Sequence, residues 1–115
     1  MERFNKYILD DDGNPVGTND LMEWAQWFES SGESHKDGEE HPRFVARDTV
    51  GEADVSTVFL GLDHNFMGEG PPILWETMIF GGKHDEYQDR YSTREAALKG
   101  HAAAMKMVKE DADGD

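Results

Sequence analysis

Apolar residues concentrate in two segments in the middle of the chain, which are separated by a loop rich in glycine and proline. Residues 54–63 (DVSTVFLGLD) and 73–80 (ILWETMIF) are dominated by β-branched and aromatic residues, which favour strands. Residues 64–72 (HNFMGEGPP) contain the residue types that form turns. The pattern therefore predicts a β-hairpin at the centre of a small sheet.

Shorter apolar segments predict further strands on either side of this hairpin. Residues 43–50 (RFVARDTV) alternate in part and turn through Gly51-Glu52 into the hairpin. Residues 6–9 (KYIL) predict a strand near the N-terminus, followed by a turn at 10–15 (DDDGNP). Val16 then returns along the same edge and makes a small ribbon.

Helical periodicity is present in two places. From about residue 20 to 31, apolar residues follow i, i+3, i+4, i+7 spacing. Asn19 or Asp20 caps this helix, and Asp20 with Glu23 resembles a capping box. A Ser-x-x-Glu capping box at 92–95 opens a second helix over 93–108. The predicted apolar stripes are Leu21, Trp24, Ala25 and Phe28 on the first helix, and Leu98, Ala102, Met105 and Val108 on the second.

Gly100 falls in the middle of the second helix, where glycine costs about 1 kcal/mol relative to alanine. A close approach of the helix to the sheet would explain a glycine at this position.

The element order β-α-β-β-β-α predicts an α+β fold, with an antiparallel meander of three to four strands and two amphipathic helices. The length of 115 residues suits one domain, which we assign to 1–109. Two polar segments flank it, a mobile acidic loop at 30–42 and a disordered acidic tail at 110–115.

Both faces of the central hairpin are apolar in sequence, so the two helices cover opposite faces or one face is buried against a second copy. Three tryptophans are many for a chain of this size. We therefore predict a homodimer with Trp75 or Trp27 near the contact.

Asp and Glu total 25 against 11 Lys and Arg, which gives a formal net charge of −14. Such a charge repels nucleic acid and anionic membranes and favours a basic partner. Residues 1–42 carry 11 acids and 3 bases, so most of the negative charge lies in the first third. The predicted partner-binding residues belong to this part: Asp10, Asp11, Asp12, Asp20, Glu23, Trp27 and Glu29.

The chain has no cysteine, no apolar run of the roughly 20 residues needed to span a membrane, and no apolar signal-peptide core. We therefore expect a cytoplasmic protein.

For Trp27 and Trp24 the alternative to a binding role is packing against the sheet and a neighbouring loop.

The densest polar cluster in the sequence lies at the mouth of the predicted hairpin and comprises Asp63, His64, Asn65 and Glu76. These residues could bind a metal or small molecule, or act as acid and base, if they converged. Pairing Asp63 with Ile73 would place Glu76 opposite Leu60, about 13 Å from His64 along the strand. A bulge could change this register. Alternatively, Asp63 and Asn65 satisfy loop backbone groups.

No other segment has a motif for catalysis or cofactor binding. The histidines form no His-Glu-x-x-His pattern, and Gly68-x-Gly70 leads into a strand rather than a helix, so it is no phosphate loop. We find no Ser/His/Asp arrangement, and we predict neither a metal nor a cofactor. Glu76 needs a partner if it is buried, for which Arg43, Arg47 and Arg90 are available.

The central motif 55–66 (VSTVFLGLDHNF) with 70–82 (GPPILWETMIFGG) resembles a family of small uncharacterised bacteriophage and prophage proteins. Residues 21–28 and 91–96 (YSTREA) are also similar to that family. The resemblance implies a viral accessory gene and assigns no activity or site residues. Residues 32–41 and the acidic tail are peculiar to this chain.

Together these features favour a non-enzymatic binding module that occupies a basic surface of a host or phage protein. Anti-CRISPR and anti-restriction proteins, which are often small and acidic, are analogous in class. The alternatives are a small-molecule-binding or metal-binding protein or enzyme that uses the hairpin mouth, and a virion or homo-oligomeric structural component.

Overall fold

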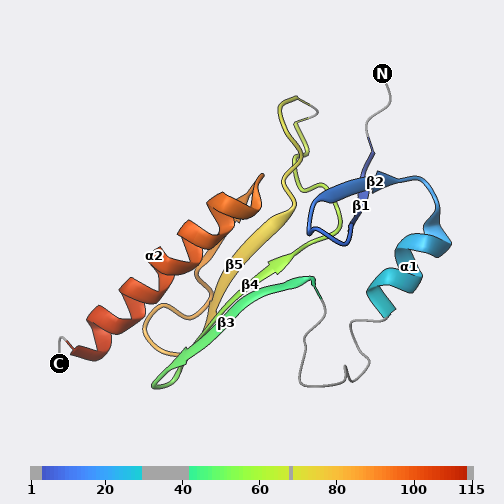
Figure 1. Cartoon of the computed structure of the whole chain (residues 1–115). Coiled ribbons are helices and arrows are strands. Elements are labelled where there is room, and N and C mark those ends of the chain that lie inside the picture. Colours follow the sequence, from blue (N-terminus) through green and yellow to red (C-terminus); the bar gives the residue numbers. More distant parts are fainter. Residues whose placement is uncertain (1–3, 30–41, 68, 114–115) are drawn as a thin grey trace.

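The computed structural model describes residues 4–29, 42–67 and 69–113 (Figure 1). The predicted loop at 30–42 lies outside these ranges except for Pro42. Eight elements are present in the described ranges: β1 (Lys6–Leu9), β2 (Pro15–Thr18), α1 (Leu21–Glu29), β3 (Phe44–Val50), β4 (Ala53–Phe59), β5 (Trp75–Phe80), β6 (Gln88–Tyr91) and α2 (Arg94–Asp113).

The predicted α+β fold is confirmed, with two strands more than the predicted order contains. β3, β4, β5 and β6 form an antiparallel meander in which β4 and β5 are central, and β1 and β2 form a separate two-stranded ribbon. β4 buries every second residue, as expected for a strand with one face against the core. The fourth strand of the meander, β6, is short and largely exposed, which is why hydropathy does not reveal it.

α2 lies along one face of the four-stranded sheet and contacts all four strands (Figure 1). Its buried residues are Ala97, His101, Ala104 and Val108. The predicted stripe is therefore wrong at Leu98, which is 40% exposed, and at Ala102, which is exposed, whereas Val108 is buried and Met105 packs half-buried against the core. Small alanine side chains on the inner face let the helix approach the sheet closely, and this contact outweighs the higher hydropathy of Leu98.

Gly100 makes this close approach possible, as its position in the helix suggests. A Cβ atom added at Gly100 would lie 2.0 Å from the Tyr91 hydroxyl oxygen and 2.2 Å from Tyr91 Cζ. The tyrosine ring therefore occupies the space that any other residue at position 100 would need.

Both ends of α2 differ from the prediction by a small number of residues. The cap is Thr93 rather than Ser92, since the Ala96 amide donates to Thr93 Oγ1 and the Ala97 amide donates to the Thr93 carbonyl. The helix continues to Asp113, so the tail predicted from residue 110 begins within it.

The central hairpin has a different register from the predicted one. Glu76 pairs with Val58 rather than with Leu60. The Leu60 amide donates to the Leu74 carbonyl and the His64 amide to the Ile73 carbonyl, so residues 61–63 are extra on the first strand. These extra residues form an irregularity of the kind that shifts register, which simple alternation does not predict.

The extra residues attach the ribbon to the sheet. Leu62 bridges to Lys6, the Tyr7 amide donates to the Gly61 carbonyl at 2.8 Å, and the Asp63 amide donates to the Asn5 carbonyl at 2.9 Å. Residues 4–29, comprising the ribbon and α1, are named the ribbon–α1 lobe below.

α1 packs on the ribbon and reaches the large sheet through its aromatic side chains. Trp24 Nε1 donates to the Gly61 carbonyl at 3.1 Å, and the Trp27 ring meets the Phe59 ring edge-on at 5.8 Å between centroids. Leu21, predicted to lie on the buried stripe, is 58% exposed, while Trp27 replaces it in the core. Packing of both indoles against the sheet and a neighbouring loop is therefore confirmed.

The sheet face opposite α2 has no helix of the described ranges lying along it, because the backbone of α1 lies beside β1 and β2, and α1 reaches β4 only through the Trp27 side chain. The register places Phe44, Val58, Met78 and Phe80 on this face. Phe44 is 39% and Phe80 48% exposed. Trp75 lies on the other face and is buried within the monomer, at 2% exposed, and the homodimer with Trp75 or Trp27 near its contact stays a prediction.

Candidate functional site

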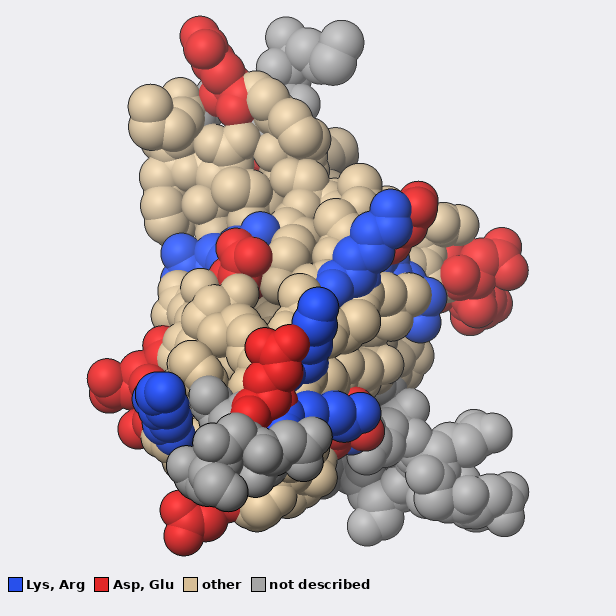
Figure 2. All heavy atoms as spheres, turned by 90° about the vertical axis from the view of Figure 1, so that its left-hand side faces the viewer, with Lys and Arg blue, Asp and Glu red and all other residues tan. Residues whose placement is uncertain are grey.

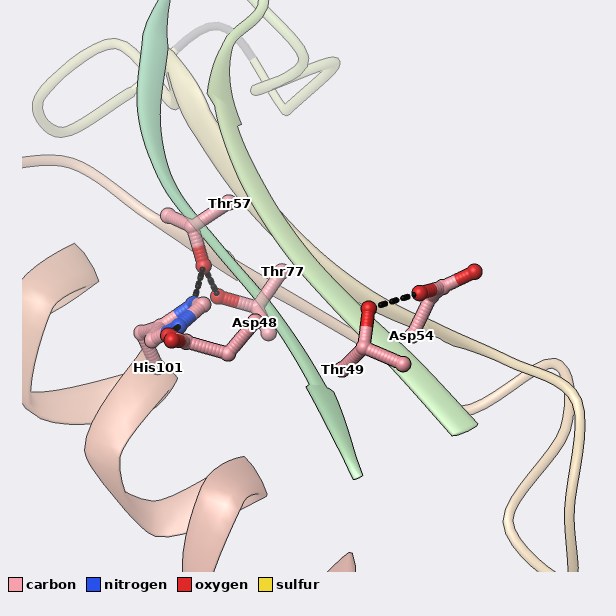
Figure 3. Close-up of polar contacts among 6 residues, drawn as sticks. All are labelled: Asp48, Thr49, Asp54, Thr57, Thr77 and His101. Atoms are coloured by element: carbon pink, nitrogen blue, oxygen red, sulfur yellow. Dashed lines mark hydrogen bonds and ion pairs between the residues drawn. The ribbon is translucent and has the colours of Figure 1, made fainter. Parts of the chain in front are cut away.

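A buried chain of polar side chains connects α2 to three strands of the large sheet (Figure 3). His101 Nδ1 lies 2.8 Å from Thr57 Oγ1, and His101 Nε2 lies 2.7 Å from Asp48 Oδ2. Thr57 Oγ1 also lies 2.6 Å from Thr77 Oγ1. Thr57 and Thr77 are directly opposite in the β4–β5 register, which is why their hydroxyls meet.

The acceptor at one end fixes the direction of these hydrogen bonds when the imidazole is neutral. The Asp48 carboxylate only accepts, so the Nε2–H of His101 donates to it. Nδ1 then accepts from the Thr57 hydroxyl, whose oxygen accepts from the Thr77 hydroxyl. Every buried polar side-chain atom of this four-residue network thus has a partner, as a stable core requires.

The hydroxyl–imidazole–carboxylate order matches that of a Ser-His-Asp catalytic triad, but its placement does not suit catalysis. Thr57 is 0% exposed and His101 is 6% exposed, so neither meets a substrate at the surface. Only Asp48, whose side chain is 52% exposed, reaches solvent. The arrangement therefore stabilises the contact between α2 and the sheet and supplies no nucleophile.

The same region contains buried polar atoms without a partner. Trp75 Nε1 and the Tyr91 hydroxyl make no hydrogen bond. Burial raises the pKa of the Tyr91 hydroxyl, and the charge of Asp89 adds to the rise, while nearby Thr77 opposes it. The Tyr91 and Thr77 hydroxyls do not meet hydrogen-bond geometry, so burial is the main cause of the raised Tyr91 pKa.

Sequence reasoning missed this network because His101 and Asp48 are 53 residues apart and neither lies in a recognisable motif. Two signals point toward it. Thr57 and Thr77 both occupy buried positions in apolar strands, where a hydroxyl needs a partner. His101 follows the glycine that marks the closest approach of helix and sheet.

The hairpin-mouth residues do not converge on a metal or a substrate. Asp63 Oδ1 accepts from the Asn65 amide at 2.8 Å and from the Ile73 amide at 3.0 Å. Asn65 Nδ2 donates to the carbonyls of Glu69 and Pro71. His64 Nδ1 lies 2.8 Å from the Leu62 carbonyl. The alternative in which these residues satisfy loop backbone groups is therefore confirmed for Asp63 and Asn65.

Glu76 forms an ion pair on the face of the sheet opposite α2. Its Oε2 lies 2.9 Å from Arg90 Nε, and Arg90 is opposite Glu76 in the β5–β6 register. Arg90, one of the three arginines considered from the sequence, is thus its partner. Within the described ranges, no group of three or more His, Asp or Glu side chains is arranged to hold a metal ion.

The predicted acidic residues all lie exposed on the ribbon–α1 lobe. Two of them also support the backbone, since Asp10 Oδ1 accepts from the amides of Asp12 and Asn14, and Asp20 Oδ1 accepts from the Glu23 amide. The latter bond confirms Asp20 as the cap of α1. The remaining carboxylates, which make no hydrogen bond of this kind, are Asp11, Asp12, Glu23 and Glu29.

The charge on this lobe is one-sided. Residues 4–29 contain six carboxylates and one lysine, a net charge of −5 in 26 positions. Residues 42–113 contain 13 carboxylates and 8 bases, so the same net −5 is spread over 72 positions. Figure 2, which looks onto the α2 side, shows Lys and Arg interspersed with Asp and Glu. The ribbon–α1 lobe is therefore the most consistently negative part of the described structure.

Comparison with protein-family models, with curated proteins and with solved structures gives no match. In the described part of the chain, no helix combines the length and apolar character that crossing a membrane requires.

Proposed function

We propose that this protein is a non-enzymatic binding module that docks the ribbon–α1 lobe on a basic surface of another protein. The observation that carries the proposal is the exposure of six carboxylates with a single lysine on that lobe. A patch of one sign concentrates the electrostatic field and accelerates encounter with a partner of opposite sign.

The placement of the polar groups supports binding over catalysis. The one hydroxyl–imidazole–carboxylate arrangement in the described ranges has its hydroxyl fully buried. The hairpin-mouth residues are hydrogen-bonded to their own loop. The exposed carboxylates of the lobe need no such constellation to act, because electrostatic recognition of a basic surface depends on charge and shape alone.

The resemblance to phage and prophage proteins narrows the setting of this proposal. In an infected cell, a small acidic accessory protein would act in the host cytoplasm on a host or phage protein with a basic groove. A groove that normally binds nucleic acid has that charge, so the function is of the anti-CRISPR or anti-restriction type. The protein would then compete with nucleic acid for the groove.

The proposal is tested by reversing carboxylates that support no backbone group. In the variant Asp11→Lys, Asp12→Lys, Glu29→Lys, the lobe changes from net −5 to net +1. Wild type and variant are immobilised and exposed to lysate of the natural host at low and high salt. We expect wild type to retain a discrete basic protein at low salt, and the variant to lose it.

A matched control changes the net charge by the same amount elsewhere. Glu52→Lys, Glu86→Lys and Glu110→Lys alter three exposed acids outside the lobe. Retention of the partner by this control identifies the lobe as the contact, whereas equal loss in both variants would show that only the total charge matters. A partner retained equally by all three proteins would contradict the proposal.

A second candidate is a homo-oligomeric or structural role, which the open face of the sheet favours. Phe44, Val58, Met78 and Phe80 line that face without a helix from the described ranges. A second copy seated there would bury these side chains while the two negative lobes stay apart. Light scattering at micromolar concentration should give twice the 13.0 kDa mass for wild type and the monomer mass for Phe80→Glu. A monomer mass for wild type contradicts this role.

A further inference from the structure

The loop between β4 and β5 presents two consecutive large apolar side chains to solvent. Phe66 is 84% exposed and Met67 is 86% exposed. Every other exposed large apolar residue in the described ranges is 64% exposed or less, including Met22 and Leu21 on α1. Single exposed apolar residues are ordinary, but an adjacent aromatic and methionine at the tip of a projecting loop are typical of binding anchors.

The loop is held in shape by its own polar side chains. Asp63 binds the amides of Asn65 and Ile73 and thereby closes the base. Asn65 binds the carbonyls of Glu69 and Pro71, and its Oδ1 accepts from the Met67 amide at 3.2 Å. A segment that its own hydrogen bonds already hold, as they hold residues 63–67, loses less conformational entropy when it binds, so the two apolar side chains are presented at a reduced entropic cost.

The base of this loop lies against the ribbon–α1 lobe. Lys6 pairs with both Leu62 and Thr18, and Thr18 leads directly to Asp20 at the start of α1. Figure 1 shows the loop rising beside β1 and β2. The loop that carries the apolar tip is therefore attached at its base to the ribbon of the acidic lobe.

The charge of the loop indicates which partner its tip suits. Residues 62–74 contain Asp63 and Glu69 and no lysine or arginine. An anionic membrane would repel such a tip, and nucleic acid would repel it too. A protein pocket that is apolar inside and basic at its rim matches both the side chains and the charge.

We propose that Phe66 and Met67 form an anchor that inserts into an apolar, basic-rimmed pocket of the partner protein. The inference rests on the proposed function, because the anchor would supply the apolar part of the contact that the acidic lobe makes with the same partner. The acidic lobe speeds encounter, and the anchor slows dissociation once the side chains are desolvated. Asn65 is a positioning residue for the anchor.

The test uses a photo-crosslinking phenylalanine analogue, p-benzoylphenylalanine, at position 66 of the full chain in the natural host. The same analogue at Phe80, which is 48% exposed on the open sheet face, is the matched control. We expect position 66 to form an adduct with one discrete protein, and position 80 not to form that adduct. Adducts with lipid, or no discrete adduct at position 66, would overturn the inference.

Affinity for the purified adduct protein supplies the decisive readout. Phe66→Ser and Met67→Ser should each raise Kd at least tenfold, mainly through dissociation, at both 0.05 and 0.5 M salt. Asn65→Ala should raise Kd by a smaller factor, through the loosened loop. The control variant Leu98→Gln changes an exposed apolar residue of α2, outside both proposed contacts, and should leave Kd within twofold. Unchanged Kd in the two loop variants overturns the anchor.

The outcomes separate the anchor from the proposed function. A partner whose binding depends on the lobe charges but not on Phe66 and Met67 refutes the anchor alone. A partner whose binding depends on Phe66 and Met67 but ignores charge reversal on the lobe refutes the proposed function and leaves the anchor standing. Because Phe66 and Met67 are exposed, both loop variants should unfold at the wild-type melting temperature. A loss of affinity at an unchanged melting temperature then reports a lost contact and not a lost fold.

Discussion

Replacing Thr57 with valine removes the central hydroxyl of the buried network without changing the shape of the side chain. The Thr57 hydroxyl contacts both His101 Nδ1 at 2.8 Å and Thr77 Oγ1 at 2.6 Å, and the residue is 0% exposed. The variant leaves an imidazole nitrogen and a hydroxyl buried without their partner. Each unsatisfied group costs about 1–3 kcal/mol, so for the two groups we expect a loss of about 2–6 kcal/mol in the free energy of unfolding.

The measurement is urea unfolding followed by circular dichroism, with thermal unfolding in parallel. At a slope of about 1.5 kcal/mol per molar urea, the midpoint should fall by more than about 1 M. The melting temperature should fall by roughly 8–24 °C, at about 4 °C per kcal/mol for a chain of this length.

The chain contains its own matched control for this substitution. Thr49 also donates a side-chain hydrogen bond, to Asp54, but is exposed on β3 (Figure 3). Thr49→Val should therefore cost no more than about 0.5 kcal/mol. The double variant Thr57→Val, Thr77→Val removes one of the unsatisfied groups, so it should cost less than the sum of the two single changes. A Thr57→Val loss no larger than that of Thr49→Val would refute the stabilising role of the network.

Three further outcomes follow from the packing and charge of the sheet. Gly100→Ala should lower the free energy of unfolding by about 1–3 kcal/mol in urea unfolding because its Cβ would meet Tyr91, whereas Ala102→Gly, on the exposed face, should lose only about 1 kcal/mol of helix propensity. Burial raises the pKa of Tyr91 above its ordinary 10.0, so the unfolded chain releases the proton first. The stability that the protonated phenol provides is complete below pH 10 and is lost as the pH rises further. Tyr91→Phe should therefore reduce the change of the urea midpoint between pH 9 and 11. Glu76→Gln should cost about 0.5–1 kcal/mol through loss of the Arg90 ion pair, a difference that 1 M NaCl should reduce.

The pairing of β4 with β5 and the positions of both helices follow from periodicity, because the residues concerned are strongly apolar and local. The inner face of α2 does not follow from it. Hydropathy ranks Leu98 above Ala97 and treats His101 as polar, but Ala97 and His101 are buried and Leu98 is partly exposed. What decides the face is a long-range fit, in which Gly100 admits the Tyr91 ring and two distant strands supply partners for the imidazole.

The candidate sites follow the same division. The exposure of the acidic residues and the Asx bonds of Asp63 and Asn65 are local properties, and sequence reasoning reaches them. The pairing of Glu76 with Arg90 depends on register, which the three extra residues 61–63 shift. These extra residues supply backbone partners to residues 5–7, at the start of the ribbon and more than 50 positions earlier in the chain.

The most direct test of the central claim is the association rate constant with the captured partner, measured across ionic strength. Wild type, the lobe variant with Asp11, Asp12 and Glu29 changed to lysine, and the control variant with three distant lysines are compared from 0.02 to 0.5 M salt. If the ribbon–α1 lobe steers binding, the wild-type rate falls steeply with salt, the control retains most of that slope, and the lobe variant is slow and nearly flat. Parallel salt dependence in all three proteins would contradict the claim that this lobe recognises the partner.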